Sequence, residues 1–104
     1  MQYQLVLQFP YDGVSDYDRA IELENELIEV LGDSGDVDGH DVGGGKLNIF
    51  VHTDDVESVF EQARSVVERV GLLPSLRSAY RHLPDGEEFT VIWPLGAQDG
   101  FDVL

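Results

Sequence analysis

Apolar and polar residues alternate at the start of the chain. The apolar positions Tyr3, Leu5, Leu7 and Phe9 are interleaved with Gln2, Gln4, Val6 and Gln8. Because successive side chains of a strand point to opposite faces, a period of two predicts a strand with one apolar and one mostly amide face. The stretch has no basic leader and no small-residue cleavage motif, so we interpret it as a strand rather than a signal peptide.

Two later segments carry apolar residues at helical spacing. In the first, residues 15–31, Ser15 is the predicted N-cap and Gly32 the residue that ends the helix. In the second, residues 54–70, the apolar positions fall on one face. Asp54 is its predicted cap, with Glu57 at capping-box spacing. We therefore expect two amphipathic helices.

Short apolar runs predict the remaining strands, at 37–42, 46–53, 76–83 and 87–93. The glycines at 43–45 and the Pro-Asp-Gly run at 84–86 are typical of turns between paired strands. The order βαββαβ, followed by one added strand, predicts an α+β fold of ferredoxin-like type. Right-handed crossovers would place both helices on one face of a mainly antiparallel sheet. The expected strand order is fourth, first, third and second, with the fifth beyond the fourth.

Residues 1–94 are predicted to form a single domain, and residues 95–104 an acidic C-terminal tail. If both helices cover one face, the other face has no helix left to cover it. That face is then solvated, covered by the C-terminal tail, or buried against a second copy of the chain, and its apolar residues Val6 and Phe50 argue against a bare solvated face. We expect Asn48, Phe50 and His52 on that face, and with His40 and Asp41 they form the candidate ligand or interaction face. Apolar area left open in this way usually marks an interaction surface, which predicts a homodimer.

Charge narrows the classes of partner. The 104 residues include 21 acidic and 6 basic side chains, for a formal net charge of -15. Such a surface repels nucleic-acid phosphates and anionic lipid, and it favours a basic protein, a cationic ligand or a metal ion. The interpretation that we prefer for the charge by itself is that it serves solubility alone. The absence of cysteine excludes disulfides and thiolate chemistry, is compatible with a cytoplasmic location, and leaves no cofactor predicted.

Asp36, Asp38 and His40 are the candidate metal ligands, because alternate residues of a strand project to one side. The alternative, which we prefer, is a solvated acidic edge that discourages strand-to-strand aggregation. His52 is the imidazole best placed to act as a general base, although a structural histidine beside a carboxylate is the simpler interpretation. No nucleophile–base–acid arrangement follows from the spacing, so no catalytic residue is assigned.

The run DGHDVGGGKLNIF, between the opening MQYQLVLQFP and the later VIWP, resembles a group of small bacterial proteins to which no activity is assigned. The resemblance implies a small cytosolic bacterial domain and transfers no site residues. The architecture is also similar to that of dimeric α+β-barrel proteins, by analogy of fold alone.

Two functional hypotheses follow. The first is a binding domain, immunity-like or regulator-like toward a basic protein. The second is a cofactor-independent enzyme or small-ligand binder, with a pocket lined by Asn48, His52, His40 and Asp41 on the uncovered face.

Overall fold

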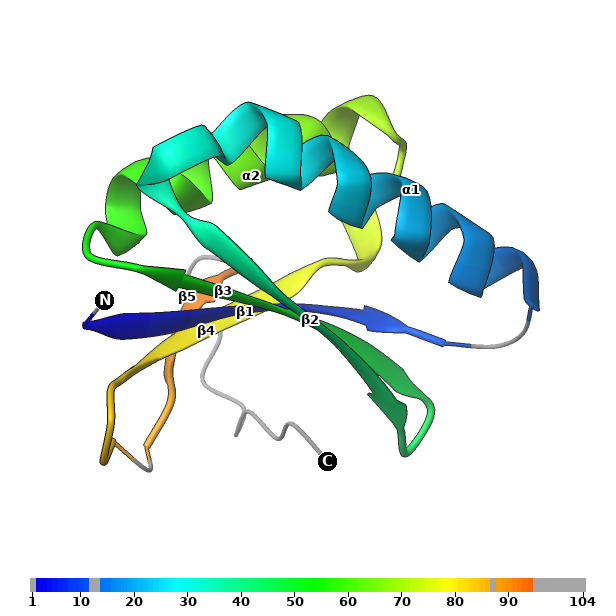
Figure 1. Cartoon of the computed structure of the whole chain (residues 1–104). Coiled ribbons are helices and arrows are strands. Elements are labelled where there is room, and N and C mark those ends of the chain that lie inside the picture. The colour runs from blue at the N-terminus through cyan, green and yellow to red at the C-terminus, as the bar shows by residue number, and fades with distance from the viewer. Residues whose placement is uncertain (1, 12–13, 87, 95–104) are drawn as a thin grey trace.

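Helices cover one face of an antiparallel sheet in this protein (Figure 1). The computed structural model describes residues 2–11, 14–86 and 88–94, with side chains 14–16 left out. Within these residues the strands and α-helices are β1 (Tyr3–Pro10), α1 (Val14–Leu31), β2 (Asp36–Gly43), β3 (Lys46–Thr53), α2 (Val56–Arg69), β4 (Arg77–His82) and β5 (Thr90–Trp93). Short 3-10 helices follow both α-helices, η1 at Gly32–Ser34 and η2 at Leu73–Ser75. The predicted α+β class is confirmed.

The described strands lie in the order β2-β3-β1-β4-β5, and every neighbouring pair is antiparallel. The central strand β1 pairs on both sides: Leu5 lies opposite Val51 of β3 and Tyr80 of β4. Because directly opposed residues share a face of the sheet, these three side chains point the same way. Register therefore fixes which residues can meet on each face.

The core lies between the sheet and the two helices. Leu5 and Leu7 of β1 are fully buried, together with Leu23 and Leu27 of α1 and Val59 of α2. Burying a side chain of this size stabilises the fold by roughly 1.5–3 kcal/mol. Both helices rest on the face that carries Leu5 and Leu7, as the apolar spacing predicts (Figure 1).

The helix starts differ from the prediction by one or two residues. Because α1 begins at Val14, Ser15 lies inside the helix and is not its N-cap. The N-cap of α2 is Asp55, whose carboxylate accepts a hydrogen bond from the Ser58 amide at 3.1 Å. The predicted cap, Asp54, instead accepts from the Gln2 amide at 2.8 Å. Its carboxylate thus ties the start of β1 to the end of β3.

Glycines end both helices. Gly32 has φ 52° directly after α1, and Gly71 has φ 80° just beyond α2. Both values lie in the left-handed region, where a side chain would clash with the backbone. The two predicted helix ends are confirmed.

Strand β2 contains a bulge that the sequence pattern did not predict. Asp36 pairs with His52, but the register shifts before Gly39, so that Asp38 is an extra residue. Gly39 has φ 128°, a conformation that residues with a side chain rarely adopt. Because of the extra residue, the side chains after the bulge point to the face opposite to the one that strict alternation predicts. Asp36 and His40 therefore lie on different faces of the sheet.

The face without helices is partly buried within the single chain. Val6, Asn48 and Ala79 are fully buried there, and Gln8 is 3% exposed. These positions are therefore not solvated, in agreement with the prediction against a bare solvated face. The apolar area on which the homodimer rested is smaller than expected, and the homodimer stays a prediction.

The last strand is shorter than predicted, because β5 spans Thr90–Trp93 rather than 87–93. The hairpin before it begins with a bond from the Gly86 amide to the His82 carbonyl at 2.9 Å. Residue 87 and the predicted tail, residues 95–104, lie outside the described residues.

Candidate functional site

The structure does not bring the predicted interaction face together as one site. His40 lies opposite Ile49, a core residue, and so belongs to the helix-covered face. Its Nδ1 atom is 3.1 Å from Glu24 Oε2 of α1, and its ring meets that of Tyr17 edge-on, with centroids 5.5 Å apart. This is the simpler role of a structural histidine beside a carboxylate.

Of the other four predicted residues, Asn48 is the most deeply placed. It accepts a hydrogen bond from Gln8 Nε2 at 3.0 Å and is fully buried. Phe50 and His52 are partly exposed on the same face, and Asp41, opposite Asn48 in the register, is exposed. Because His40 is on the other side of the sheet, the four-residue pocket of the second hypothesis is not formed.

The metal-ligand prediction is also corrected by the bulge in β2. Asp36 and Asp38 do lie near an imidazole, but it is that of His52 rather than His40. One ligand atom from each of the three lies within 4.8 Å of the others, and His52 Nε2 is 3.7 Å from Asp38 Oδ2. Metal–ligand bonds of about 2 Å would require these atoms to move closer together. Both carboxylates are exposed, as in the solvated acidic edge that the sequence favours.

A pocket that the sequence did not predict lies where β1 begins, β3 ends and α2 starts. Its volume is about 480 Å³, within the range of small-ligand sites. The described residues that line it are Tyr3, Asp54, Asp55, Val56, Glu57, Phe60, Glu61, Tyr80, His82 and Ile92. We call it the aromatic–acidic pocket.

Aromatic rings from two strands form one wall of the aromatic–acidic pocket. Tyr3 of β1 lies directly opposite His82 of β4, and their ring centroids are 4.8 Å apart. Tyr80 meets Tyr3 edge-on at 5.8 Å and His82 at 6.4 Å. The three rings share the helix side of the sheet because their positions are paired or two residues apart. Tyr3 and Tyr80 are partly buried, whereas His82 is exposed.

Carboxylates form the other wall. Asp54 and Asp55 are held in place by the amides of Gln2 and Ser58, each through one oxygen. Glu57 and Glu61 follow on the first turns of α2, and both are exposed. The positive end of the helix dipole stabilises acidic groups here, but it amounts to only about half an elementary charge. The carboxylates outweigh it, so the pocket is negative.

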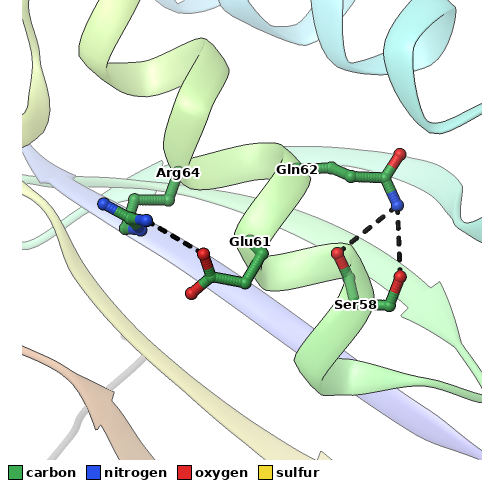
Figure 2. A network of polar contacts seen from close by, with 4 residues as sticks. All are labelled: Ser58, Glu61, Gln62 and Arg64. Atoms are coloured by element: carbon green, nitrogen blue, oxygen red, sulfur yellow. Dashed lines mark hydrogen bonds and ion pairs between the residues drawn. The ribbon is translucent and has the colours of Figure 1, made fainter.

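One cation lies beside this wall. Arg64 donates to Glu61 at 2.9 Å along the exposed side of α2, next to the contacts between Gln62 and Ser58 (Figure 2). Its guanidinium lies 5.7 Å from the ring centre of Trp93. The hydrogen bond that Arg64 donates to Glu61 raises the pKa of Arg64 above its ordinary value, and the negative charge of that carboxylate adds to the effect. Arg64 is therefore a permanent cation, but it does not line the pocket.

The side chains of the aromatic–acidic pocket are suited to attract a positively charged group. Among its described lining residues there is no Lys, Arg, Ser, Thr or Cys, so neither a cation nor the usual nucleophiles face the cavity. Rings with a negative π face and carboxylates both attract positive charge. In the sequence, only the closely spaced acidic residues 54, 55 and 57 could have pointed to this pocket. Tyr3 is far from Tyr80 and His82 in the chain, so no sequence pattern brings the aromatic wall together.

Within the described residues, neither helix has the length and apolar character needed to cross a membrane. Searches among family models, curated proteins and solved structures find no match for this chain. The resemblance carried by the DGHDVGGGKLNIF segment therefore stays a prediction.

Proposed function

We propose that the protein is a non-enzymatic binding domain that recognises a basic protein, in an immunity-like or regulator-like role. The observation that carries the proposal is the grouping of Asp54, Asp55, Glu57 and Glu61 around one cavity, with no Lys or Arg among its described lining residues. A cationic segment of a partner would meet complementary charge there, and of the four carboxylates Glu61 is the one already paired with Arg64.

The charge of the whole chain supports this proposal. A formal net charge of -15 on 104 residues creates a negative potential that accelerates the approach of a basic partner. The same potential opposes nucleic acids and anionic membranes. Such attraction weakens as salt is added, because the screening length is only about 8 Å at physiological ionic strength.

The finer assignment of the fold belongs to the same proposal. The element order β1-α1-β2-β3-α2-β4, with β5 added, supports a ferredoxin-like βαββαβ arrangement. A cytoplasmic location in a bacterium and a homodimer complete the proposed setting. Light scattering coupled to size exclusion would decide the oligomeric state, and a monomeric mass at all concentrations would exclude the homodimer.

Binding to a defined basic probe tests the proposed function. The probe is a short peptide of alternating Arg and Gly, and its Glu–Gly counterpart serves as the negative control, both titrated by calorimetry at low and high salt. We expect binding of the Arg peptide alone, weakening as salt rises. No binding of the Arg peptide at low salt would overturn the proposal.

Two variants of equal net charge test whether binding is localised. Asp54→Asn with Glu57→Gln removes charge from the pocket, and Asp18→Asn with Glu22→Gln removes the same charge from exposed positions in the first half of α1. Each lost ion pair should cost roughly 0.2–1 kcal/mol, so the pocket variant should bind the Arg peptide several-fold more weakly than the α1 variant. Equal losses would show unlocalised attraction and contradict the proposed site.

A further inference from the structure

We infer that the aromatic–acidic pocket binds a single guanidinium group, such as that of an arginine side chain, rather than a metal ion. This rests on the proposed function, because the group would belong to the basic partner. The pocket combines two features that a guanidinium uses together: flat aromatic faces on one side and carboxylate oxygens on the other.

The aromatic wall favours an organic cation. Tyr3, Tyr80 and His82 lie within 4.8–6.4 Å of one another, centroid to centroid, and so present several ring faces and edges to one volume. A guanidinium is weakly hydrated and stacks on such rings, whereas a metal ion keeps its water unless hard ligands replace it. Phe60 and Ile92 supply apolar surface for the methylene stem.

Among the described residues, the carboxylates that line the pocket do not form a group of three or more with oxygens close enough together to suggest metal ligation. Within the described residues, the group of side chains close enough to suggest metal ligation is Asp36, Asp38 and His52, away from this cavity. Glu57 and Glu61 are instead one turn apart on α2. Four separate residues supply these carboxylates, and a guanidinium, which has five N–H donors, can bond to more than one of them.

The chain already holds one guanidinium in this way. Arg64 lies over the ring of Trp93 while it donates to Glu61, so an aromatic face and a carboxylate share one cation beside the pocket. Glu61 also lines the pocket, which means that Arg64 neutralises one of its four carboxylates. Arg64 should therefore limit the affinity of the pocket for a second guanidinium.

The direct test uses small probes. N-acetyl-arginine N-methylamide carries the guanidinium without other charges, and the matching citrulline compound is nearly the same shape but neutral. Backbone amide shifts in NMR titrations report where each binds. We expect the arginine compound to shift the amides of Tyr3, Asp55 and Tyr80 with a dissociation constant on the order of millimolar, and the citrulline compound to leave them unchanged.

Substitutions at the pocket should weaken binding of the arginine compound in two cases and strengthen it in a third. Glu57→Gln should weaken binding of the arginine compound roughly two- to fivefold, whereas Glu22→Gln, with the same charge change on α1, should not. Tyr80→Leu should weaken it by a similar factor, with Tyr17→Leu on α1 as the control. Arg64→Gln should strengthen it roughly two- to fivefold, because Glu61 becomes available. Thermal unfolding of each variant verifies that it is folded.

The outcomes separate this inference from the proposed function. If the arginine and citrulline compounds shift the same amides equally, or neither shifts them, the guanidinium site is wrong even where the Arg–Gly peptide binds. If calcium or zinc ions shift the pocket amides and the arginine compound does not, the inference is likewise overturned. If the arginine compound binds but the Arg–Gly peptide does not, the site stands and the basic-protein partner is wrong.

Discussion

Arg64 on α2 lies over the ring of Trp93 in β5, with 5.7 Å between the guanidinium carbon and the ring centre. The same ring meets Phe60, a core residue of the helix, at a centroid distance of 6.0 Å. Strand β5 is only four residues long, so few backbone hydrogen bonds attach it to β4. Trp93 therefore links the edge of the sheet to the helix layer through side chains.

Replacing Trp93 with Leu should lower the free energy of unfolding by about 1–3 kcal/mol. The loss combines the aromatic contact with Phe60 and the cation–π contact with Arg64, each worth about 0.5–1.5 kcal/mol. Urea denaturation measures the change. In a double-mutant cycle, Arg64→Gln should cost less in the Trp93→Leu background than in the native one. Identical costs in both backgrounds would show that the two side chains do not interact.

Gly39→Ala should destabilise the protein by about 1–2 kcal/mol, because φ 128° lies in a region that L residues avoid. An added methyl group at Gly39 would meet no atom within 4 Å, so the cost comes from backbone strain alone. Gly35→Ala is the contrasting variant: its φ is -153°, but the methyl would lie 3.1 Å from Val51 Cγ1.

Denaturation curves separate the two causes. A Val51→Ala background makes room beside Gly35 and should reduce the cost of Gly35→Ala, while leaving that of Gly39→Ala unchanged. If Gly39→Ala does not change the free energy of unfolding, the bulge does not depend on the positive φ of Gly39. The placement of His40 on the helix side of the sheet would then need another explanation.

Sequence reasoning was most successful where the signal is local. The helical spacing of Val59, Phe60 and Ala63 predicted α2, and these residues are buried against the sheet. The glycines at 32 and 71 marked the helix ends because their conformational freedom is a property of the single residue. The α+β class followed from such elements without knowledge of any long-range contact.

What the sequence could not predict depends on register. One extra residue at Asp38 moved His40 to the helix side, and no composition or spacing rule signals that shift. The aromatic–acidic pocket was missed for a similar reason. Tyr3, Asp55 and Tyr80 are far apart in the chain and meet only because β1 pairs with both β3 and β4.

The buried amide pair on the other face of the sheet gives a further prediction. Gln8 Nε2 donates to Asn48 Oδ1 at 3.0 Å, and both side chains are almost wholly buried. Asn48→Leu should lower the free energy of unfolding by about 1–3 kcal/mol, because it removes an acceptor from a buried amide. Gln8→Leu combined with Asn48→Leu should cost less than the sum of the two single changes. Strict additivity would mean that the pair contributes nothing as a pair.

The start of α2 provides the sharpest test of the local geometry. Of its two adjacent aspartates, Asp55 caps the helix and Asp54 bonds to the amide of Gln2. Asp55→Ala removes the oxygen that accepts from the Ser58 amide and should cost about 1 kcal/mol of unfolding free energy. Asp55→Asn keeps an acceptor there and should recover most of the loss. Asp54→Ala breaks only the exposed bond from the Gln2 amide, near the chain terminus, so its cost should be smaller. Chemical denaturation of the three variants would contradict the assigned cap if Asp54→Ala proved the more damaging change, as the sequence pattern alone predicts.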